Sequence, residues 1–315
     1  MRRVLITGAN GQIGSELTAA LRQRYGNKEV LATDVKEPPA GLQESGPFEL
    51  MDCTDCSHID RVIKTFKPDT VYHLAALLSA VAEEKPQAAW NVNIQGLFYV
   101  LEAAREYNCA VFTPSSIGAF GPATPADNTP QDTIQRPSTM YGVTKVSGEL
   151  LCDYYYKRFG VDTRGVRYPG IISYKTLPGG GTTDYAVEIY YEAIKKQTYD
   201  SFLKEGTLLD MMYMPDALKA AIDIMEADGS KLEHRNAFNV TAISAAPEDF
   251  EKAIQKHIPD FTLGYNIDPV RQGIADSWPN SMDDSAARQE WGWEPEFDLD
   301  TMTEDMLEHL RVKLQ

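Results

Sequence analysis

The sequence predicts an α/β fold built on a doubly wound parallel sheet. Short, wholly apolar runs alternate along the chain with longer helical patterns, and glycines follow the first apolar run directly. Apolar runs without polar alternation are typical of strands buried on both faces, as in parallel sheets covered by helices on each side. Alternation of such strands with helices indicates βαβ units.

The expected elements follow in chain order. The first strand is Val4-Leu5-Ile6, and a helical pattern of apolar residues begins at Ile13. A second strand over 29–33 ends at Asp34. Further central strands are expected at 71–74 and 110–113, with helices at 57–66, 86–107 and 141–159.

The regular alternation ends after residues 167–169. A glycine-rich loop at 178–184 leads into a helix over 184–197, and residues 210–215 resemble a return to the main sheet. We therefore expect a dinucleotide-binding domain over 1–170, to which 205–240 return. Residues 171–204 and 241–315 are expected to form a smaller C-terminal substrate lobe, at the sheet edge where such folds bind ligands.

Composition excludes several classes of protein. The 315 residues include 30 Lys and Arg against 46 Asp and Glu, a net charge of −16, which argues against nucleic-acid binding. No apolar run is long enough to span a membrane, and the N-terminus lacks a signal or transit pattern. Four cysteines do not make a disulfide framework. We expect a cytoplasmic protein with no membrane or nucleic-acid partner.

Three glycines after the first strand predict a dinucleotide site. Gly8, Gly11 and Gly14 stand between a strand and a helix, where backbone N–H groups and the helix N-terminus favour a pyrophosphate. Their spacing is one residue wider than G-x-G-x-x-G, and a plain strand-to-helix turn is the alternative. Asp34 ends the second strand, where an acid binds the ribose diol and repels a 2′-phosphate, so NAD is favoured over NADP.

Two further features fit the same ligand. Asp52 could accept a hydrogen bond from the adenine amino group, although a solvated loop acid or a helix cap would explain it equally well. The small residues of Leu74-Ala75-Ala76 would let the backbone lie against the cofactor.

A tyrosine and a lysine four residues apart form the candidate catalytic pair. Tyr141 and Lys145 fall on one face of a helix, and a nearby cation favours the phenolate form of a tyrosine. Ser116, which follows an earlier strand, could bridge the substrate oxygen and the tyrosine.

As an ordered set, these motifs resemble the extended short-chain dehydrogenase/reductase family. The set is Thr7 to Gly14, Asp34, Leu74-Ala75-Ala76, Asn93-x2-Gly96, Ser115-Ser116, Tyr141-x3-Lys145 and Arg167-Tyr168-Pro169. The resemblance implies a Rossmann fold, with Tyr141 as acid/base, Ser116 orienting the reacting oxygen and Lys145 binding the nicotinamide ribose. Asn93 would brace a helix bend or a water of the proton relay. The implied cofactor contacts are Gly8, Gly11, Gln12, Ile13, Gly14, Asp34, Asp52, Leu74, Ala75, Ala76, Asn93, Tyr141, Lys145 and Tyr168.

Later segments resemble one branch of that family, the short-chain L-threonine 3-dehydrogenases, which are relatives of UDP-galactose 4-epimerase. These segments are 179–186, 211–217, 274–279 and 287–293. The resemblance implies NAD-dependent oxidation of L-threonine to 2-amino-3-oxobutanoate. It also implies substrate contacts from Ser79, Thr183 and Trp278, with glycines 179–181 allowing a lid to close. The alternatives are a loop hydroxyl for Ser79, a helix N-cap for Thr183 and lobe packing for Trp278.

Rival interpretations remain. An NDP-sugar epimerase or dehydratase on this scaffold would need basic residues for a diphosphate, and region 170–215 has lysines but no arginine. A catalytically idle NAD-binding regulator does not explain an intact catalytic set. Cys53-x2-Cys56 and the five scattered histidines suggest no metal site. The tyrosines of 154–156 lie on the helix of Tyr141, and by the family resemblance this helix and the one near 96–107 predict a homodimer.

Overall fold

The computed structural model describes residues 2–175 and 181–315, and these form two compact units. The first unit comprises Met1–Ser116, Thr139–Arg167 and Leu218–Phe238. The second comprises Ile117–Ser138, Tyr168–Ala217 and Asn239–Gln315. The chain therefore crosses between the units several times, and each unit is assembled from distant stretches of sequence.

The first unit is built on a parallel sheet in the order β3-β2-β1-β4-β5-β7. The strands are β1 (Val4–Thr7), β2 (Val30–Asp34), β3 (Phe48–Leu50), β4 (Thr70–His73), β5 (Ala110–Phe112) and β7 (Thr163–Arg164). The strand order reverses between β1 and β4, and Thr7 lies opposite both Thr33 and His73. In sheets of this kind, ligands bind beyond the carboxyl ends of the strands at that switch point. The predicted α/β fold is confirmed.

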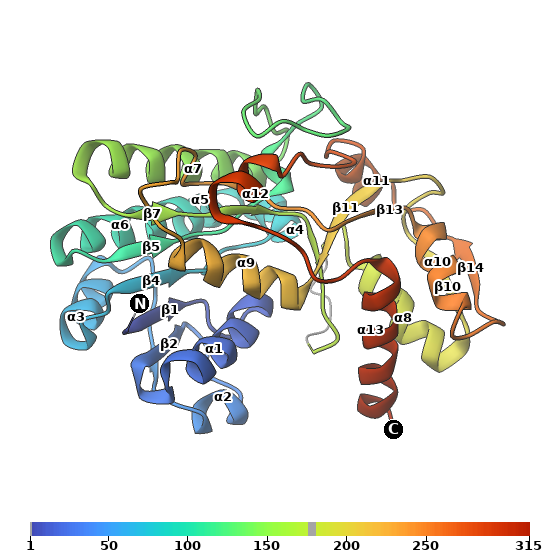
Figure 1. Cartoon of the computed structure of the whole chain (residues 1–315), viewed down its shortest axis with the longest axis horizontal. Coiled ribbons are helices and arrows are strands. Elements are labelled where there is room, and N and C mark those ends of the chain that lie inside the picture. The colour runs from blue at the N-terminus through green and yellow to red at the C-terminus, as the bar shows by residue number, and fades with distance from the viewer. Residues whose placement is uncertain (1, 176–180) are drawn as a thin grey trace. The chain divides into compact units, whose positions relative to one another are not determined.

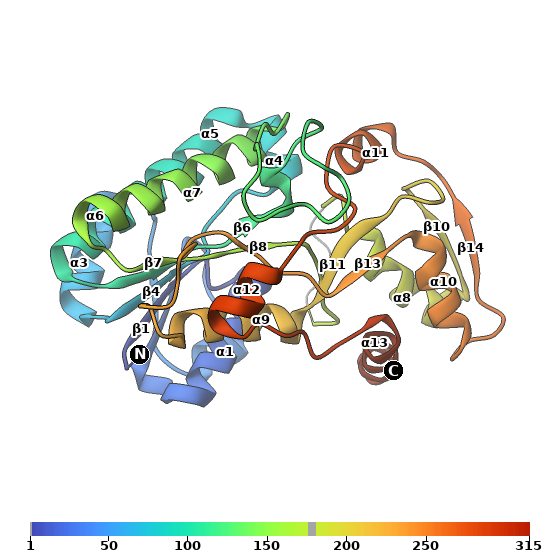
Figure 2. The same ribbon diagram turned by 45° about the horizontal axis from the view of Figure 1, so that its top comes forward.

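Helices cover both faces of this sheet (Figures 1 and 2). On one face lie α3 (Cys56–Phe66), α6 (Gly96–Tyr107) and α7 (Met140–Phe159). Their apolar residues share a core cluster with Leu5, Val71 and Val111 of the sheet. On the other face lie α1 (Gln12–Tyr25) and α9 (Met214–Glu226), where the Tyr72 hydroxyl donates to the Ala221 carbonyl.

The segment expected as one helix over 86–107 is divided. It consists of α5 (Pro86–Trp90), a π-helical turn η2 (Asn91–Gln95) and α6, and the Gly96 N–H donates to the Asn91 carbonyl. Such turns bond residues five apart, and they interrupt the regular rotation of side chains around a helix. Short helices α2 (Ala40–Glu44) and α4 (Ser79–Glu84) also belong to this unit, as does η1 (Asn27–Glu29).

The second unit has its own sheet, in the order β13-β11-β9, and a separate core. Its strands are β9 (Gly170–Ile172), β10 (Thr198–Ser201), β11 (Leu209–Tyr213), β13 (Ile243–Ala245) and β14 (Thr262–Tyr265), of which β10 and β14 pair with each other. Its helices are η3 (Ile117–Ala119), α8 (Tyr185–Lys196), α10 (Pro247–Gln255), α11 (Pro269–Ala275), α12 (Ser285–Trp291) and α13 (Leu299–Lys313). A further short sheet contains β12 (Phe238–Asn239), β8 (Val166–Tyr168) and β6 (Ser115–Ser116).

One strand differs from the expectation. Residues 210–215 were expected to return to the main sheet, but β11 pairs in parallel with β9 and antiparallel with β13. The chain re-enters the first unit only at Leu218, within α9. A buried apolar strand has the same local pattern in either sheet, so the sequence indicated the strand without indicating its neighbours.

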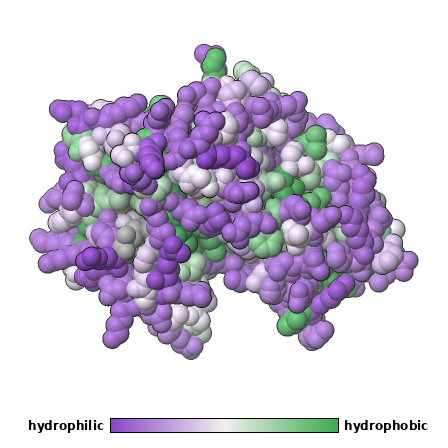
Figure 3. All heavy atoms as spheres, viewed as in Figure 1, coloured by the Kyte–Doolittle hydropathy of each residue, from purple (hydrophilic) through white to green (hydrophobic). Residues whose placement is uncertain are grey.

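The face shown in Figure 3 is predominantly hydrophilic, with apolar residues in scattered patches. Among the described residues, no helix is long and apolar enough to cross a membrane. The four cysteines are free thiols, and no cluster of three or more His, Cys, Asp or Glu side chains in residues 2–175 and 181–315 is arranged to hold a metal ion.

Candidate active site

The glycine turn between β1 and α1 is closely packed against its surroundings. Gly8 has a positive φ of 71°, and a Cβ added there would lie 2.7 Å from the Ala75 nitrogen. A Cβ at Gly14 would lie 2.2 Å from the Gly8 carbonyl oxygen. Only glycine fits these positions, because any larger residue would displace backbone. The turn thus brings bare backbone to the N-terminus of α1, an arrangement suited to an anionic group.

The carboxylate of Asp34 is tied to this turn. One oxygen accepts the Asn10 N–H at 3.0 Å, and the other accepts the Lys36 N–H at 3.1 Å. The Asn10 side chain donates to the carbonyls of Lys36 at 2.8 Å and Glu37 at 3.2 Å. Asn10 therefore joins the glycine turn to the end of β2. Sequence analysis missed this residue, and its place inside the glycine turn was the available signal.

The adjacent ends of β1 and β4 share a buried hydrogen bond. Thr7 Oγ1 lies 2.8 Å from His73 Nδ1, and both side chains are buried. Burial, reinforced by the charge of Lys145, lowers the pKa of His73 to about 3. The imidazole is therefore neutral at physiological pH, and it supports the strand ends from which residues 74–76 continue.

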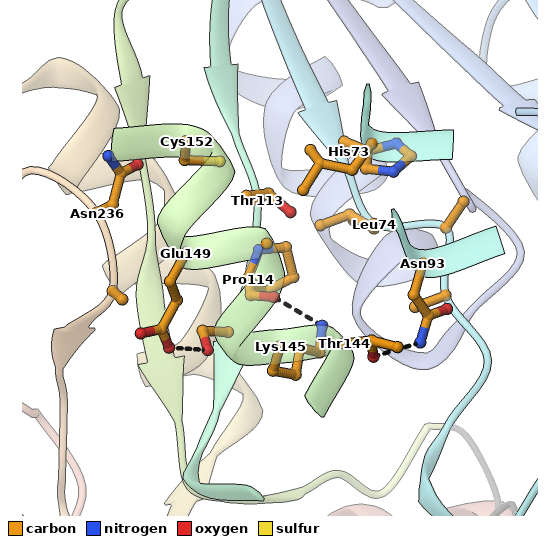
Figure 4. Close-up of a pocket in the computed structure, with 16 residues that line it drawn as sticks. His73, Leu74, Asn93, Thr113, Pro114, Thr144, Lys145, Glu149, Cys152 and Asn236 are labelled. Atoms are coloured by element: carbon orange, nitrogen blue, oxygen red, sulfur yellow. Dashed lines mark hydrogen bonds between the residues drawn. The ribbon is translucent and has the colours of Figure 1, made fainter. Parts of the chain in front are cut away.

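The predicted catalytic residues on α7 lie against the strand end that carries Ser116. Thr139 caps α7 by accepting the Gly142 N–H at 3.1 Å, so the helix begins one residue before Tyr141. Lys145 Nζ lies 5.3 Å from the centroid of the Tyr141 ring. The same ammonium donates to the Pro114 carbonyl at 2.7 Å, two residues before Ser116 (Figure 4). Lys145 thus joins the tyrosine helix to the serine strand.

Asn93 is also linked to α7. Its Nδ2 donates to Thr144 Oγ1 and to the Leu77 carbonyl, each at 3.1 Å, and its Oδ1 accepts the Leu77 N–H at 2.8 Å. Asn93 lies within the π-helical turn η2, and its side chain reaches Thr144 of α7 (Figure 4). The role of Asn93 in bracing a bend stays a prediction.

A small cavity of about 30 Å³ lies at the centre of this arrangement, wholly within the first unit. Ala75, Asn93 and Lys145 line it together with Ser115 and Glu149. Residues of η2, β6, α7 and the segment after β4 therefore meet at one point beyond the sheet, although they are distant in sequence.

Asp52 and Ser79, two of the predicted ligand contacts, lie in the first unit. Asp52 is exposed, and one of its oxygens accepts both the N–H of Thr54 at 2.8 Å and its hydroxyl at 2.7 Å. Asp52 does not cap α3, because Asp55 does so. Ser79 is the first residue of α4 and is buried.

Three predicted contacts belong to the second unit. The buried Tyr168 donates its hydroxyl to the Ala217 carbonyl at 2.5 Å. Thr183 packs at Gly170 and does not cap α8, since Asp184 is the N-cap residue. Trp278 packs on a small cluster formed by Ile117, Phe120 and Met282. Of the predicted hinge glycines, Gly179 and Gly180 lie outside the described residues, and the lid prediction with them.

A family model, described as the NAD dependent epimerase/dehydratase family, matches residues 4–241. The chain belongs to this family. NAD is therefore its cofactor, and the glycine turn and Asp34 at the end of β2 both fall within the matched residues. This finding confirms the predicted family and the predicted cofactor.

Individual proteins show a more specific similarity than the family model does. The chain is 57% identical to an uncharacterized epimerase/dehydratase of Staphylococcus saprophyticus, over 99% of this chain and 98% of that protein. It is 59% identical to the solved L-threonine dehydrogenase of Clostridium difficile, with a TM-score of 0.98 and coverage of 99% and 98%. A monomeric L-threonine 3-dehydrogenase from a metagenome is 46% identical, with a TM-score of 0.94 and coverage of 99% and 100%.

The residues of the first unit fit the family's cofactor. The close backbone packing at Gly8 and Gly14 excludes side chains from the turn, so bare backbone stands at the N-terminus of α1, as a pyrophosphate requires. Asp34 is fixed at the end of β2, where a ribose diol is bound in such folds. The site combines this cradle with a tyrosine and a lysine, the groups needed to move a proton from an alcohol.

Proposed function

We propose that this chain is an L-threonine 3-dehydrogenase that oxidises the β-hydroxyl of L-threonine to the ketone of 2-amino-3-oxobutanoate. The observation that carries the proposal is the pair formed by Tyr141 and Lys145. Lys145 also donates a hydrogen bond to the Pro114 carbonyl, two residues before Ser116, and so connects the pair to the serine. The 59% identity to a solved L-threonine dehydrogenase, over nearly the whole of both chains, supports the choice of substrate.

In the proposed mechanism, the phenolate of Tyr141 accepts the proton of the threonine hydroxyl. Lys145 Nζ lies 5.3 Å from the centroid of the tyrosine ring, where its positive charge would attract the negative charge of the phenolate. Ser116 donates a hydrogen bond that orients the reacting oxygen. NAD+ held at the glycine turn would accept the hydride from the β-carbon of threonine. Gly8, Gly14 and Asp34 are the residues that would hold it.

The proposed substrate contacts are Ser79, Thr183 and Trp278, and the proposed role of the second unit is substrate binding. These assignments rest on the resemblance to the threonine dehydrogenase branch. Thr183→Ala and Ser79→Ala should raise the KM for threonine more than the KM for NAD, because they remove hydrogen bonds to the amino acid alone. Equal changes in both KM values would contradict a substrate role.

The test of the function is the initial rate of NADH formation with L-threonine as substrate. UDP-galactose serves as the competing sugar nucleotide, and L-serine serves as an alcohol that lacks the methyl group. We expect threonine to be oxidised with the highest kcat/KM. No NADH formation with threonine, under conditions where the protein binds NAD, would refute the proposal.

The acid/base assignment is tested by Tyr141→Phe, which removes only the hydroxyl. We expect kcat to fall by about 10²-fold or more, while the dissociation constant of NADH changes little. Tyr154→Phe is the matched control, because it removes a tyrosine hydroxyl from the same helix at a position outside the proposed catalytic set. A Tyr141→Phe enzyme that keeps most of its kcat would show that another group takes the proton.

The proposal extends to assembly and compartment. Exposed apolar side chains of α6 and α7, among them Phe98, Leu150 and Tyr154, support a homodimer through these helices. One similar enzyme is described as monomeric, so the molar mass in solution, measured by light scattering, decides this point. Free thiols support a cytoplasmic location. We also propose metal-independent catalysis, which predicts full activity after treatment with a chelator.

A further inference from the structure

A buried carboxylate lies on α7 one turn beyond Lys145. Tyr141, Lys145 and Glu149 follow each other at intervals of four residues, so they lie along one face of the helix. Glu149 is only 8% exposed, and it lines the small cavity together with Lys145 (Figure 4). The proposed mechanism assigns it no part in the chemistry.

Among the described residues, Arg167 and Ser115 from different elements both bind Glu149. Arg167 of β8 donates to it through Nε at 3.1 Å and through a terminal nitrogen at 2.9 Å. Ser115 of β6 donates its hydroxyl to the oxygen that also accepts Arg167 Nε. Arg167 and Ser115 are each 7% exposed, so all three side chains are more than nine-tenths buried. Arg167 thus anchors the carboxylate that receives the serine hydroxyl.

This contact determines how the neighbouring Ser116 is presented. Ser115 and Ser116 are consecutive residues of β6, so the hydrogen bond that holds Ser115 against α7 also restricts the backbone that carries Ser116. Lys145 donates a hydrogen bond to the carbonyl of Pro114, the residue before Ser115. Two side chains from successive turns of α7 therefore hold two successive residues just before Ser116.

We infer that the Glu149–Arg167 pair is a positioning device, which through Ser115 fixes the Ser116 hydroxyl relative to Tyr141. The inference rests on the proposed function for the role of Ser116. Glu149 takes no proton from the substrate and does not touch it. Its effect on the reaction passes through the placement of the serine, and misplacement of about 1 Å can lower a rate about 10²-fold.

Stability and positioning can be separated experimentally. Removal of one partner of a buried ion pair leaves an unpaired charge and destabilises the fold, whereas replacement of both partners by apolar residues is often neutral. The variant Glu149→Met/Arg167→Met should therefore fold and bind NADH as the wild type does. We expect its kcat to be about 10- to 100-fold lower. Wild-type kcat in a folded double variant would overturn the inference.

Ser115 provides a milder test that leaves the ion pair intact. Ser115→Ala should lower kcat by about tenfold with the KM for NAD unchanged, and Ser115→Thr, which keeps the hydroxyl, should restore most of the rate. In a Ser116→Ala background, Ser115→Ala should have no further effect, since its target is already absent. Additive losses in the two variants would overturn the inference.

A matched control is Asp162→Asn. Asp162 also pairs with a buried arginine of the first unit, Arg164, through two hydrogen bonds at 2.9 and 2.8 Å. Its loss should lower stability and leave kcat unchanged. A comparable loss of kcat in Asp162→Asn would show that any broken ion pair slows the enzyme, and the inference would fall.

The proposed function and the positioning role of Glu149 and Arg167 can be refuted independently of each other. If wild-type protein does not oxidise threonine, the proposed function fails, and crystal structures of the Ser115→Ala variant decide the positioning role. A displacement of the Ser116 hydroxyl by more than about 0.5 Å supports positioning, because catalytic groups must be held within that range. An unmoved Ser116 would refute it.

Discussion

Asp210, the second residue of β11, makes the stability of this protein depend on pH. Its side chain is fully buried, accepts a hydrogen bond from the Thr241 hydroxyl, and accepts the Met282 N–H at 2.9 Å. Burial raises the pKa of this carboxyl to about 7, from an ordinary 3.8, although these hydrogen bonds favour the charged form. Asp210→Asn removes the ionisation while keeping a group of the same shape.

The sign and size of the effect follow from the two pKa values. Below 3.8 the carboxyl is protonated in both states, and above 7 it is ionised in both. Between these limits the folded protein holds a proton that the unfolded chain has lost, so the free energy of unfolding falls as pH rises. The rise of the pKa from 3.8 to about 7 corresponds to a loss of about 4 kcal/mol in the free energy of unfolding, and this loss is complete above pH 7.

Urea unfolding of the wild type and of Asp210→Asn, from about pH 4 to about pH 8, measures this contribution. The difference in free energy between the two proteins should change by up to about 4 kcal/mol in favour of the variant across this range. All other titrating groups are common to the two proteins, so their contributions cancel in this difference. Parallel stability curves would refute the reasoning, because they would mean that Asp210 titrates alike in the folded and unfolded chains.

Three further predictions concern the first unit. Gly14→Ala should abolish NAD binding in calorimetry, since its Cβ would lie 2.2 Å from the Gly8 carbonyl; binding of ordinary strength would contradict the packing argument. Asp34→Ala should reduce the preference for NAD over NADP in kcat/KM, and an unchanged ratio would exclude the ribose role. His73, with a folded pKa of about 3, is neutral in the fold but protonates when unfolded, so stability should fall as pH falls below 6.5. Between about pH 6.5 and 4.5 the loss should be about 2 kcal/mol. In urea titrations His73→Gln should not show this loss of stability. A variant that is as sensitive to acid as the wild type would contradict the role of His73.

The parts of the fold that sequence predicts well are those whose signal is local. Gly8 and Asp34 stand at the ends of β1 and β2, and contiguous residues define those strands. The interval between Tyr141 and Lys145 follows from helix geometry alone. Their attachment to the Ser116 strand depends on the Lys145 bond to Pro114, which connects residues 31 positions apart.

What the sequence could not show depends on tertiary partners. Glu149 and Arg167 are ordinary charged residues until α7 and β8 bring them together in a buried pair. The placement of β11 depends on β9 and β13, neither of which alters the pattern of β11 itself. Thr183 looks like a helix cap next to Asp184, and only backbone geometry shows that Asp184 holds that position.

The π-helical turn η2 also limits which length changes this segment can tolerate. Each residue of an α-helix turns about 100° around the axis, and a π turn accommodates one more residue than an α turn does. Deleting one residue from 91–95 would convert the segment to a continuous helix and rotate Asn93 relative to the apolar face of α6. The helix could then satisfy its core contacts at Leu97 and Leu101 or the bonds to Thr144 and Leu77, but not both. The segment between α5 and α6 therefore has a fixed length, whatever substitutions its individual positions accept.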